Sequence, residues 1–319
     1  MPAALEFQEV TKRYAGADAA AVDRLTLRVE PGETCMLVGP SGSGKTTAMR
    51  MVNRMVDVTS GDILIDGRSV LGESPSELRR HIGYVIQHVG LFPHRTVRQN
   101  IATVPELLGW PRDRIAARVR ELVEIVGLEP ALGDRYPSQI SGGQRQRVGV
   151  ARALAADPPL MLMDEPFGAL DPITRDRLQG EFLRLKERVQ TTIVFVTHDI
   201  DEAIRLGDRV SILRDGRLVQ DATPGELLLH PADGFVEEFV GADRALKRLA
   251  LLRVQDAQLE PGDDDGPPLA ASASLRDALA ALLQEPDGRL PVVDGDRALG
   301  VLTVEAVHAK LRREAEVTS

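Results

Sequence analysis

Cysteine and positive charge are both scarce in this 319-residue chain. A single cysteine, Cys35, excludes a disulfide framework and a cysteine-based zinc site, and it fits a reducing compartment. The 48 acidic residues outnumber the 39 Lys and Arg, which gives a formal net charge of −9. A surface that binds nucleic acid needs a basic patch or stripe, so this balance argues against nucleic acid as a partner.

Long apolar runs are also missing. No run approaches the roughly 18 residues that a membrane-spanning helix needs. The first residues carry Glu6 and Glu9 and no basic segment followed by an apolar one, so we expect no signal peptide. A role at a membrane would therefore come through a partner. The length allows one large domain and a smaller one.

The chain does contain a glycine-rich segment with the pattern G-x-x-x-x-G-K-[ST]. It follows a short apolar run that ends at Val38 and precedes a segment with few helix breakers, which predicts strand, turn and helix. In that context the loop N–H groups and the helix N-terminus face one anion. Lys45 can reach the β- and γ-phosphates of a nucleoside triphosphate, and the Thr46 hydroxyl can bind Mg²⁺. The residues predicted to hold the nucleotide here are Gly39, Pro40, Ser41, Gly42, Ser43, Gly44, Lys45, Thr46 and Thr47. The alternative is a glycine-rich surface turn.

Strands alternate with helices through the first 220 residues. Apolar residues alternate with polar ones before the loop, around residues 5–7 and 22–29, which predicts an antiparallel β layer. Apolar runs at 160–163 and 192–197 predict buried strands, and residues 112–126 and 141–156 predict helices. The pattern indicates an α/β domain with a largely parallel sheet, in which ligands bind at the carboxyl ends of strands. Lys45, Glu165 and His198 all lie just after strands.

Two further motifs suit nucleotide chemistry. Asp164 and Glu165 end a predicted strand, where the first can hold Mg²⁺ and the second can orient an attacking water. Acidic residues also end strands for structural reasons. Ser141 opens a helix with Gly142, Gly143 and Gln144, which makes a second anion site or a simple N-cap. One nucleotide needs one such site, so the second suggests a nucleotide held by another subunit.

These motifs resemble those of the ATP-binding cassette (ABC) ATPases in order and spacing, over about residues 3–240. The segments that carry the resemblance are residues 39–47, Gln87, 140–144, 160–165, 168–171 and His198. The departures are Ile140, where Leu is usual, and Gly168, where Ser is common. Neither removes a polar group that catalysis needs. The resemblance implies an α/β P-loop core with a mixed sheet, flanking helices, an antiparallel β layer and a helical subdomain at about 88–158.

The resemblance also implies the chemistry. Two copies of the chain would face head to tail, with each ATP between one phosphate loop and the partner's residues 141–144. It assigns adenine stacking to Tyr14, a place at the cassette interface to Asp171, the general base to Glu165 and γ-phosphate contact to His198. Mg²⁺ would be held by Thr46, Asp164 and Gln87, and Gln87 would also sense the attacking water.

Finer resemblance points to the ATPases of osmoprotectant importers, through residues 84–94, 100–108, 168–175 and 239–249. It implies uptake of a compatible solute such as glycine betaine, choline or carnitine. The partners would be transmembrane permease subunits at the cytoplasmic face of the membrane and, indirectly, a substrate-binding protein. The alternatives are an importer for another small solute, such as an amino acid or an anion, and a soluble ABC ATPase. Soluble types usually carry two cassettes or a long coiled-coil insertion, and this chain has neither.

The composition changes after residue 240. We predict a linker at 241–250, an acidic loop around Asp263–Asp265, and a small α+β unit at 251–319. That unit resembles a single CBS motif, which implies either pairing between subunits or ligand sensing. Many such motifs carry a ribose-binding Asp three residues after the Thr. Here Ala306 follows Thr303 at that spacing, which argues against nucleotide binding.

Overall fold

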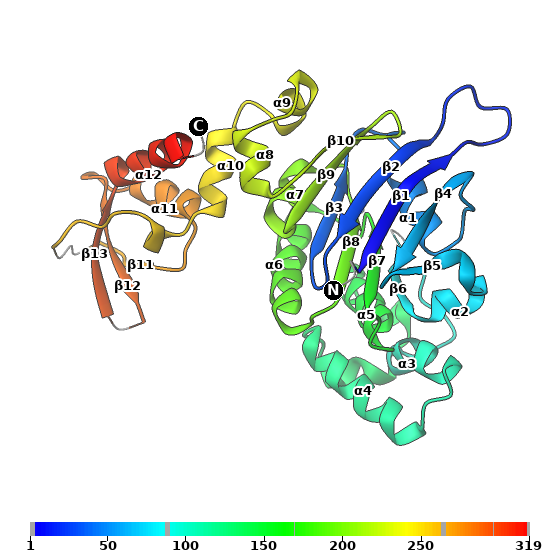
Figure 1. The fold of residues 1–319 in the computed structure, drawn as a ribbon. Helices are drawn as coiled ribbons and strands as arrows, with labels where there is room; N and C mark the ends of the chain where they lie inside the picture. The colour runs from blue at the N-terminus through cyan, green and yellow to red at the C-terminus, as the bar shows by residue number, and fades with distance from the viewer. Residues whose placement is uncertain (1–3, 87–89, 169, 263–265, 296, 318–319) are drawn as a thin grey trace. The chain divides into compact units, whose positions relative to one another are not determined.

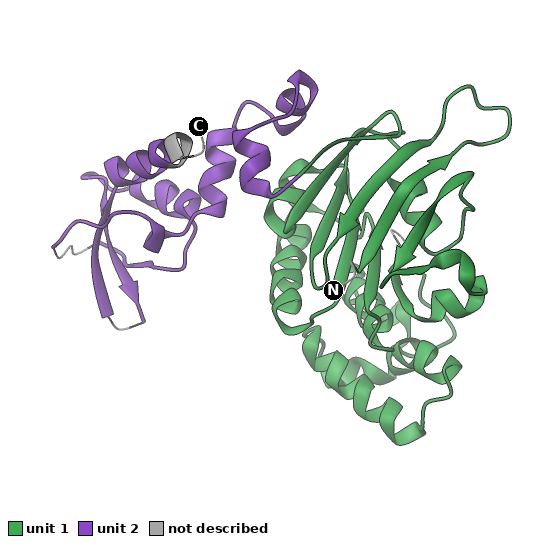
Figure 2. Ribbon diagram, in the orientation of Figure 1, with its two compact units in different colours: residues 1–221 green, residues 222–319 purple. Residues whose placement is uncertain are grey.

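The structure, a computed structural model, describes residues 4–86, 90–168, 170–262, 266–295 and 297–317. Gln87 and the acidic loop at 263–265 therefore lie outside the described residues. The chain divides into two compact units, residues 1–221 and 222–319 (Figure 2). The domain boundary at residue 240 stays a prediction. In the structure, residues 222–240 group with the second unit because α8 (Pro224–Leu229) packs against α10 (Arg244–Leu251).

Unit 1 is built on a six-stranded sheet in the order β10-β9-β3-β8-β7-β6 (Figure 1). The central strands β3 and β8 are buried at every residue, as expected of a sheet covered on both faces. The pairs β6/β7, β7/β8, β8/β3 and β3/β9 are parallel, as predicted. The strands are β3 (Thr34–Val38), β6 (Ile82–Val85), β7 (Leu160–Asp164), β8 (Thr192–Val196), β9 (Arg209–Arg214) and β10 (Arg217–Ala222).

The predicted antiparallel layer is confirmed as a four-stranded sheet in the order β2-β1-β4-β5. Its inward side chains, such as Leu5, Phe7 and Leu25, pack in one core with Met49 and Met51 of α1. The strands are β1 (Leu5–Lys12), β2 (Val22–Val29), β4 (Ser60–Ile65) and β5 (Arg68–Ser69). This packing fixes α1 and the loop before it.

Seven α-helices lie in the described part of unit 1. Figure 1 shows α3, α4 and α5 grouped at one end of the unit, where they pack on one another. The predicted helix at 112–126 is α4, with Val119, Leu122 and Val123 buried. The predicted helix at 141–156 is α5, which ends at Leu154. The helices are α1 (Lys45–Val52), α2 (Pro75–Arg80), α3 (Val97–Leu107), α4 (Arg112–Ile125), α5 (Gly142–Leu154), α6 (Pro172–Arg188) and α7 (Ile200–Leu206).

Three phenylalanines tie α6 to the sheet. The ring centroids of Phe167, Phe182 and Phe195 lie 5.8–6.3 Å apart, within the range of favourable aromatic pairs. Phe195 belongs to β8, Phe182 to α6, and Phe167 to the segment after β7. The long helix α6 is therefore anchored beside the end of β7.

Unit 2 has its own core of buried apolar side chains and a three-stranded sheet, β11-β12-β13. Strands β12 (Arg289–Asp294) and β13 (Arg297–Thr303) form an antiparallel pair. Ser274 and Thr303 cap α11 (Leu275–Leu282) and α12 (Val304–Val317) by accepting the N–H groups of Asp277 and Ala306. The elements are α8 (Pro224–Leu229), α9 (Gly234–Val240), α10 (Arg244–Leu251), β11 (Leu269–Ala270), α11 (Leu275–Leu282), β12 (Arg289–Asp294), β13 (Arg297–Thr303) and α12 (Val304–Val317).

The turn after β3 requires glycine at its first residue. Gly39 has φ of 146°, and a Cβ at this position would overlap the backbone carbonyl oxygen of Leu213 at the end of β9. Gly42 also has a positive φ, 83°, but a Cβ there would meet no atom within 4 Å. Gly39 is therefore required both by its backbone conformation and by its close packing, whereas Gly42 is required by its backbone conformation alone.

We therefore expect Gly39→Ala to lower the free energy of unfolding by more than about 3 kcal/mol, since backbone must move to admit the methyl group. Gly42→Ala should cost about 1–2 kcal/mol, the price of a left-handed non-glycine residue. Urea unfolding followed by fluorescence of Trp110, the one tryptophan of the chain, reports on unit 1. Equal losses for the two variants would contradict the packing argument.

Candidate nucleotide site

The phosphate loop joins the end of β3 to the start of α1. Gly44 precedes the helix in a left-handed conformation with φ of 100°, and Ser43 and Lys45 are buried. The ammonium of Lys45 lies inside the loop, where it donates to the carbonyl oxygens of Gly39 (2.7 Å) and Pro40 (2.9 Å). Burial lowers the pKa of Lys45, while the carboxylates of Glu165 and Asp164 oppose this shift. The loop therefore holds one positive charge in a ring of backbone dipoles.

The two described candidates for Mg²⁺ binding meet beside this loop. Thr46 lies in the first turn of α1 and Asp164 ends β7, and the Thr46 hydroxyl donates to Asp164 Oδ1 at 3.4 Å. Burial raises the pKa of Asp164, and the charge of Arg50 and the Thr46 hydrogen bond counter it. Within the described ranges no cluster of three or more His, Cys, Asp and Glu side chains could hold a metal ion. The two oxygen donors of Thr46 and Asp164 alone suit Mg²⁺, because this ion usually keeps waters and nucleotide phosphates among its ligands.

Glu165 has an unusual backbone conformation. Its φ is 43°, in the left-handed region that costs a glutamate about 1–3 kcal/mol. Its N–H donates to the Val196 carbonyl at 3.0 Å, which holds the residue against β8. Its carboxylate Oε1 lies 3.3 Å from His198 Nδ1. Strain of this kind is concentrated at functional sites, where neighbouring structure holds a side chain in place.

Arg50 lies beside the candidate Mg²⁺ residues although the glycine-rich motif at 39–47 does not include it. It lies on α1, four residues after Thr46 and therefore on the same face of the helix. Its charge lowers the pKa of Asp164, and its side chain hydrogen-bonds to Tyr84. Burial raises the pKa of Tyr84, with a further contribution from Asp164. Helical spacing from Thr46 is the signal that could have found Arg50.

The second predicted anion site opens α5. Ser141 Oγ accepts the N–H of Gln144 at 3.2 Å, and Gln144 Oε1 accepts the N–H of Ser141 at 2.8 Å. This reciprocal pair is a capping box. Ser141 is exposed, and Gly142 and Gly143 occupy the first turn, whose N–H groups lack partners within the helix. Among the residues that the structure describes, no hydrogen bond or ion pair joins residues 141–144 to residues 39–47.

Two other predicted residues lie at the surface. Tyr14 follows β1 with 45% of its surface exposed, and the ammonium of Lys12 lies 5.1 Å from its ring centroid. Asp171 caps α6 by accepting the N–H of Thr174 at 3.0 Å, and this hydrogen bonding lowers its pKa. Both roles stay predictions. The assignment to Gln87 falls outside the described residues. Among the described helices, none is long and apolar enough to cross a membrane.

Comparison with known proteins places these features in a family. Residues 22–168 match the family model for the ABC transporter domain. The chain is 47% identical over 320 residues to the choline transport ATP-binding protein OpuBA of Bacillus subtilis (strain 168), across 99% of this chain and 82% of that protein. It is 48% identical over 317 residues to the glycine betaine/carnitine/choline transport ATP-binding protein OpuCA of the same organism, across 98% of this chain and 81% of that protein.

The fold comparison agrees. A dimeric structure of a post-hydrolysis state of the ATP-binding cassette MJ0796, bound to ADP and Pi, superimposes with a TM-score of 0.60 and 32% identity. The match covers 69% of this chain and 98% of that one, which confirms the predicted cassette fold. With relatives this similar over almost its whole length, the chain belongs to the ABC transporter family, as an ATP-binding and ATP-hydrolysing subunit.

Proposed function

We propose that this protein couples ATP binding and hydrolysis to the uptake of a quaternary amine such as glycine betaine, choline or carnitine. The observation that carries the proposal is identity at nearly half of all positions, over almost the whole chain, to two transport ATP-binding proteins for these solutes. The subunit would bind transmembrane permease subunits at the cytoplasmic face of the membrane, as a peripheral protein. A substrate-binding protein would deliver the solute, so solute selectivity would lie outside this chain.

ATP would bind with its phosphates on residues 39–47 and its adenine on Tyr14. Thr46 and Asp164 would hold Mg²⁺ together with the phosphates, and Gln87 is assigned to the same ion. Their donor set supports this assignment, because a hydroxyl and a carboxylate beside a buried ammonium are the groups that nucleotide-bound Mg²⁺ uses. When bound, Mg²⁺ neutralises charge on the phosphate oxygens.

Glu165 would act as the general base. Its carboxylate would accept a proton from the water that attacks the γ-phosphate, while Lys45 stabilises the charge that develops on the phosphate oxygens. His198 would contact the γ-phosphate beside Glu165, and its Nδ1 lies 3.3 Å from Glu165 Oε1. The left-handed backbone of Glu165 is the kind of strain that functional sites retain.

A second copy of the chain would complete the site. Ser141, Gly142, Gly143 and Gln144 would contact the partner's nucleotide, and Asp171 would lie at the interface between the copies. The exposure of Ser141 and Asp171 at the chain's own surface supports this arrangement. Residues 251–319, after the proposed linker 241–250, would form the CBS-like unit, which pairs subunits or senses a ligand. ATP-driven closure and opening of the dimer would then drive the permease.

Glu165→Gln should bind ATP with nearly unchanged affinity and hydrolyse it about 10²–10⁴-fold more slowly, because an amide cannot accept the proton. Phosphate release in the steady state and binding of a fluorescent ATP analogue measure the two effects. Glu187→Gln, at an exposed position of α6, is the matched control. Turnover near the wild-type rate in Glu165→Gln would remove Glu165 from the role of base.

Complementation tests the shared site. Lys45→Ala breaks the phosphate loop and Ser141→Arg blocks the opposite surface, so each variant alone should be inactive. After mixing, half of the dimers are mixed and one of their two sites is intact, so activity should return to about a quarter of wild type. Lys45→Ala mixed with Glu165→Gln should stay inactive, because both changes fall on the same half-site. Equal recovery in both mixtures would contradict the head-to-tail arrangement.

Transport itself decides the solute class. The chain, purified with its permease, is placed in vesicles that contain ATP, and uptake of radiolabelled glycine betaine is measured with the substrate-binding protein outside. We expect ATP-dependent uptake that unlabelled choline or carnitine inhibits and that Glu165→Gln abolishes. Inhibition only by sulfate or by amino acids would instead favour an importer for an anion or an amino acid. Failure to purify with any permease would favour the soluble ABC ATPase.

A further inference from the structure

A cavity of about 260 Å³ lies in unit 1, apart from the residues assigned to the nucleotide. Its walls come from the end of α4, the middle of α5, the second half of α6 and Phe167 (Figure 1). This volume far exceeds the roughly 30 Å³ of one water and approaches the ~300–1,000 Å³ of small-molecule sites. Its lining combines buried apolar side chains with charged ones.

The inner wall is apolar and aromatic. Val150, Phe167, Leu178, Phe182 and Leu185 line it, and each is at least nine-tenths buried. Two phenylalanine rings in one small cavity favour a ligand with an apolar body. The wall is well fixed, because the same rings pack against each other and against Phe195 of β8.

Three buried polar atoms of the lining have no hydrogen-bond partner among the described residues, Gln146 Nε2, Arg147 Nε and Glu181 Oε2, and the last two lie 3.4 Å apart as an ion pair. Gln146 is 4% exposed, and its Nε2 donates no hydrogen bond to any described residue. Such a buried amide is costly unless it meets an acceptor. The side chain lines the cavity, so the missing acceptor can be supplied by an oxygen of a bound molecule.

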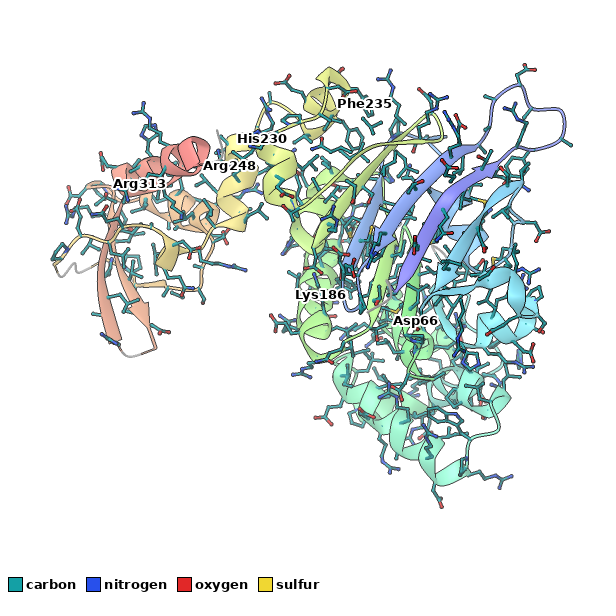
Figure 3. All side chains as sticks on the ribbon, in the orientation of Figure 1. Asp66, Lys186, His230, Phe235, Arg248 and Arg313 are labelled. Atoms are coloured by element: carbon teal, nitrogen blue, oxygen red, sulfur yellow. The ribbon has the colours of Figure 1, made fainter. Side chains whose placement is uncertain are left out.

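The mouth of the cavity carries unpaired positive charge. Arg184 and Arg188 are exposed, and neither forms a hydrogen bond or ion pair with another described residue. The neighbouring Lys186 on the same helix (Figure 3) behaves differently, since its ammonium donates to Asp208 Oδ1 at 2.7 Å and to the Leu206 carbonyl at 3.1 Å. The ammonium group of Lys186 is therefore paired within the protein, whereas the guanidinium groups of Arg184 and Arg188 can pair with a bound anion.

The other charges of the cavity nearly balance. Arg147 Nε lies 3.4 Å from Glu181 Oε2, and Arg147 Nη1 donates to the Gly127 carbonyl at 2.8 Å. Glu124 is the remaining carboxylate of the lining, against the two guanidinium groups at the mouth. The lining thus keeps a net positive charge and an unsatisfied donor above an apolar wall.

We propose that this cavity binds a small organic anion with an apolar body, such as an aromatic or branched carboxylate. The body would pack on Phe167 and Phe182, an acceptor oxygen would take the hydrogen bond of Gln146, and the negative charge would lie at Arg184 and Arg188. The inference rests on the cavity alone and not on the proposed transport function.

Such a ligand would contact two residues that lie close in sequence to parts of the proposed ATP site. Gln146 lies on α5, five residues after Ser141, and Phe167 follows Glu165 by two residues. A molecule in contact with both would change how α5 moves relative to the end of β7. The ligand should therefore alter ATP hydrolysis as well as bind.

The probe for the test is 8-anilinonaphthalene-1-sulfonate, an aromatic anion, titrated into the full chain and followed by its fluorescence. We expect one saturable site, and Arg184→Glu with Arg188→Glu should weaken it by about tenfold or more. The matched control, Arg68→Glu with Arg112→Glu, reverses two exposed charges that do not line the cavity and should leave the dissociation constant unchanged. Gln146→Leu should weaken the same site.

A neutral analogue, N-phenyl-1-naphthylamine, separates charge recognition from damage to the fold. Its binding should be unaffected by the two changes at Arg184 and Arg188. Equal affinity of the anionic probe for both double variants would overturn the proposal, as would parallel loss of both probes. Should the charge reversal prevent folding, Arg184→Gln with Arg188→Gln gives the same comparison with a smaller expected loss, and no loss would again overturn it.

Discussion

The parallel register of β7, β8 and β3 is the constraint on which the nucleotide site depends. Val196 of β8 pairs with Leu37 of β3 on one side and with Asp164 of β7 on the other. The three strands therefore end at one level. Backbone bonds extend this alignment past the strands, since Glu165 N–H donates to the Val196 carbonyl and Thr197 N–H to the Leu37 carbonyl. A slip of one residue would separate Glu165 from residues 39–47.

The placement of Lys45, Glu165 and His198 at one edge of the sheet could be predicted from sequence, because parallel strands share one carboxyl edge. Their close approach also needs β7, β8 and β3 to be neighbours, which the sequence pattern does not indicate. The left-handed backbone of Glu165 and the place of Arg50 could not be predicted in this way. The conformation of Glu165 depends on a hydrogen bond to the carbonyl of Val196, which lies 31 residues further along the chain. The place of Arg50 depends on which face of α1 is turned toward the end of β7.

Four helices of unit 1 also escaped prediction, of which α3 and α6 are the longest. α3 contains Pro105, which normally argues against a helix interior, and α6 has charged residues between its buried positions Leu178, Phe182 and Leu185. In α3, packing against α4 and α5 stabilises the helix. In α6, the aromatic contacts of Phe182 with Phe167 and Phe195 stabilise a helix that the local sequence pattern did not predict. Tertiary contacts thus override local signals in both.

The capping box at Ser141 does not compete with phosphate binding by the same residues. Ser141 Oγ uses a lone pair to accept the N–H of Gln144, which leaves its own O–H free to donate. The N–H groups of Gly142 and Gly143 lie in the first helical turn and have no acceptor within α5. One set of atoms therefore stabilises the start of α5, while a second set has no acceptor within the helix. In the head-to-tail dimer that we propose, the second set would contact the partner's nucleotide, so capping and recognition would be two uses of one motif, and only recognition would need the exposure of Ser141.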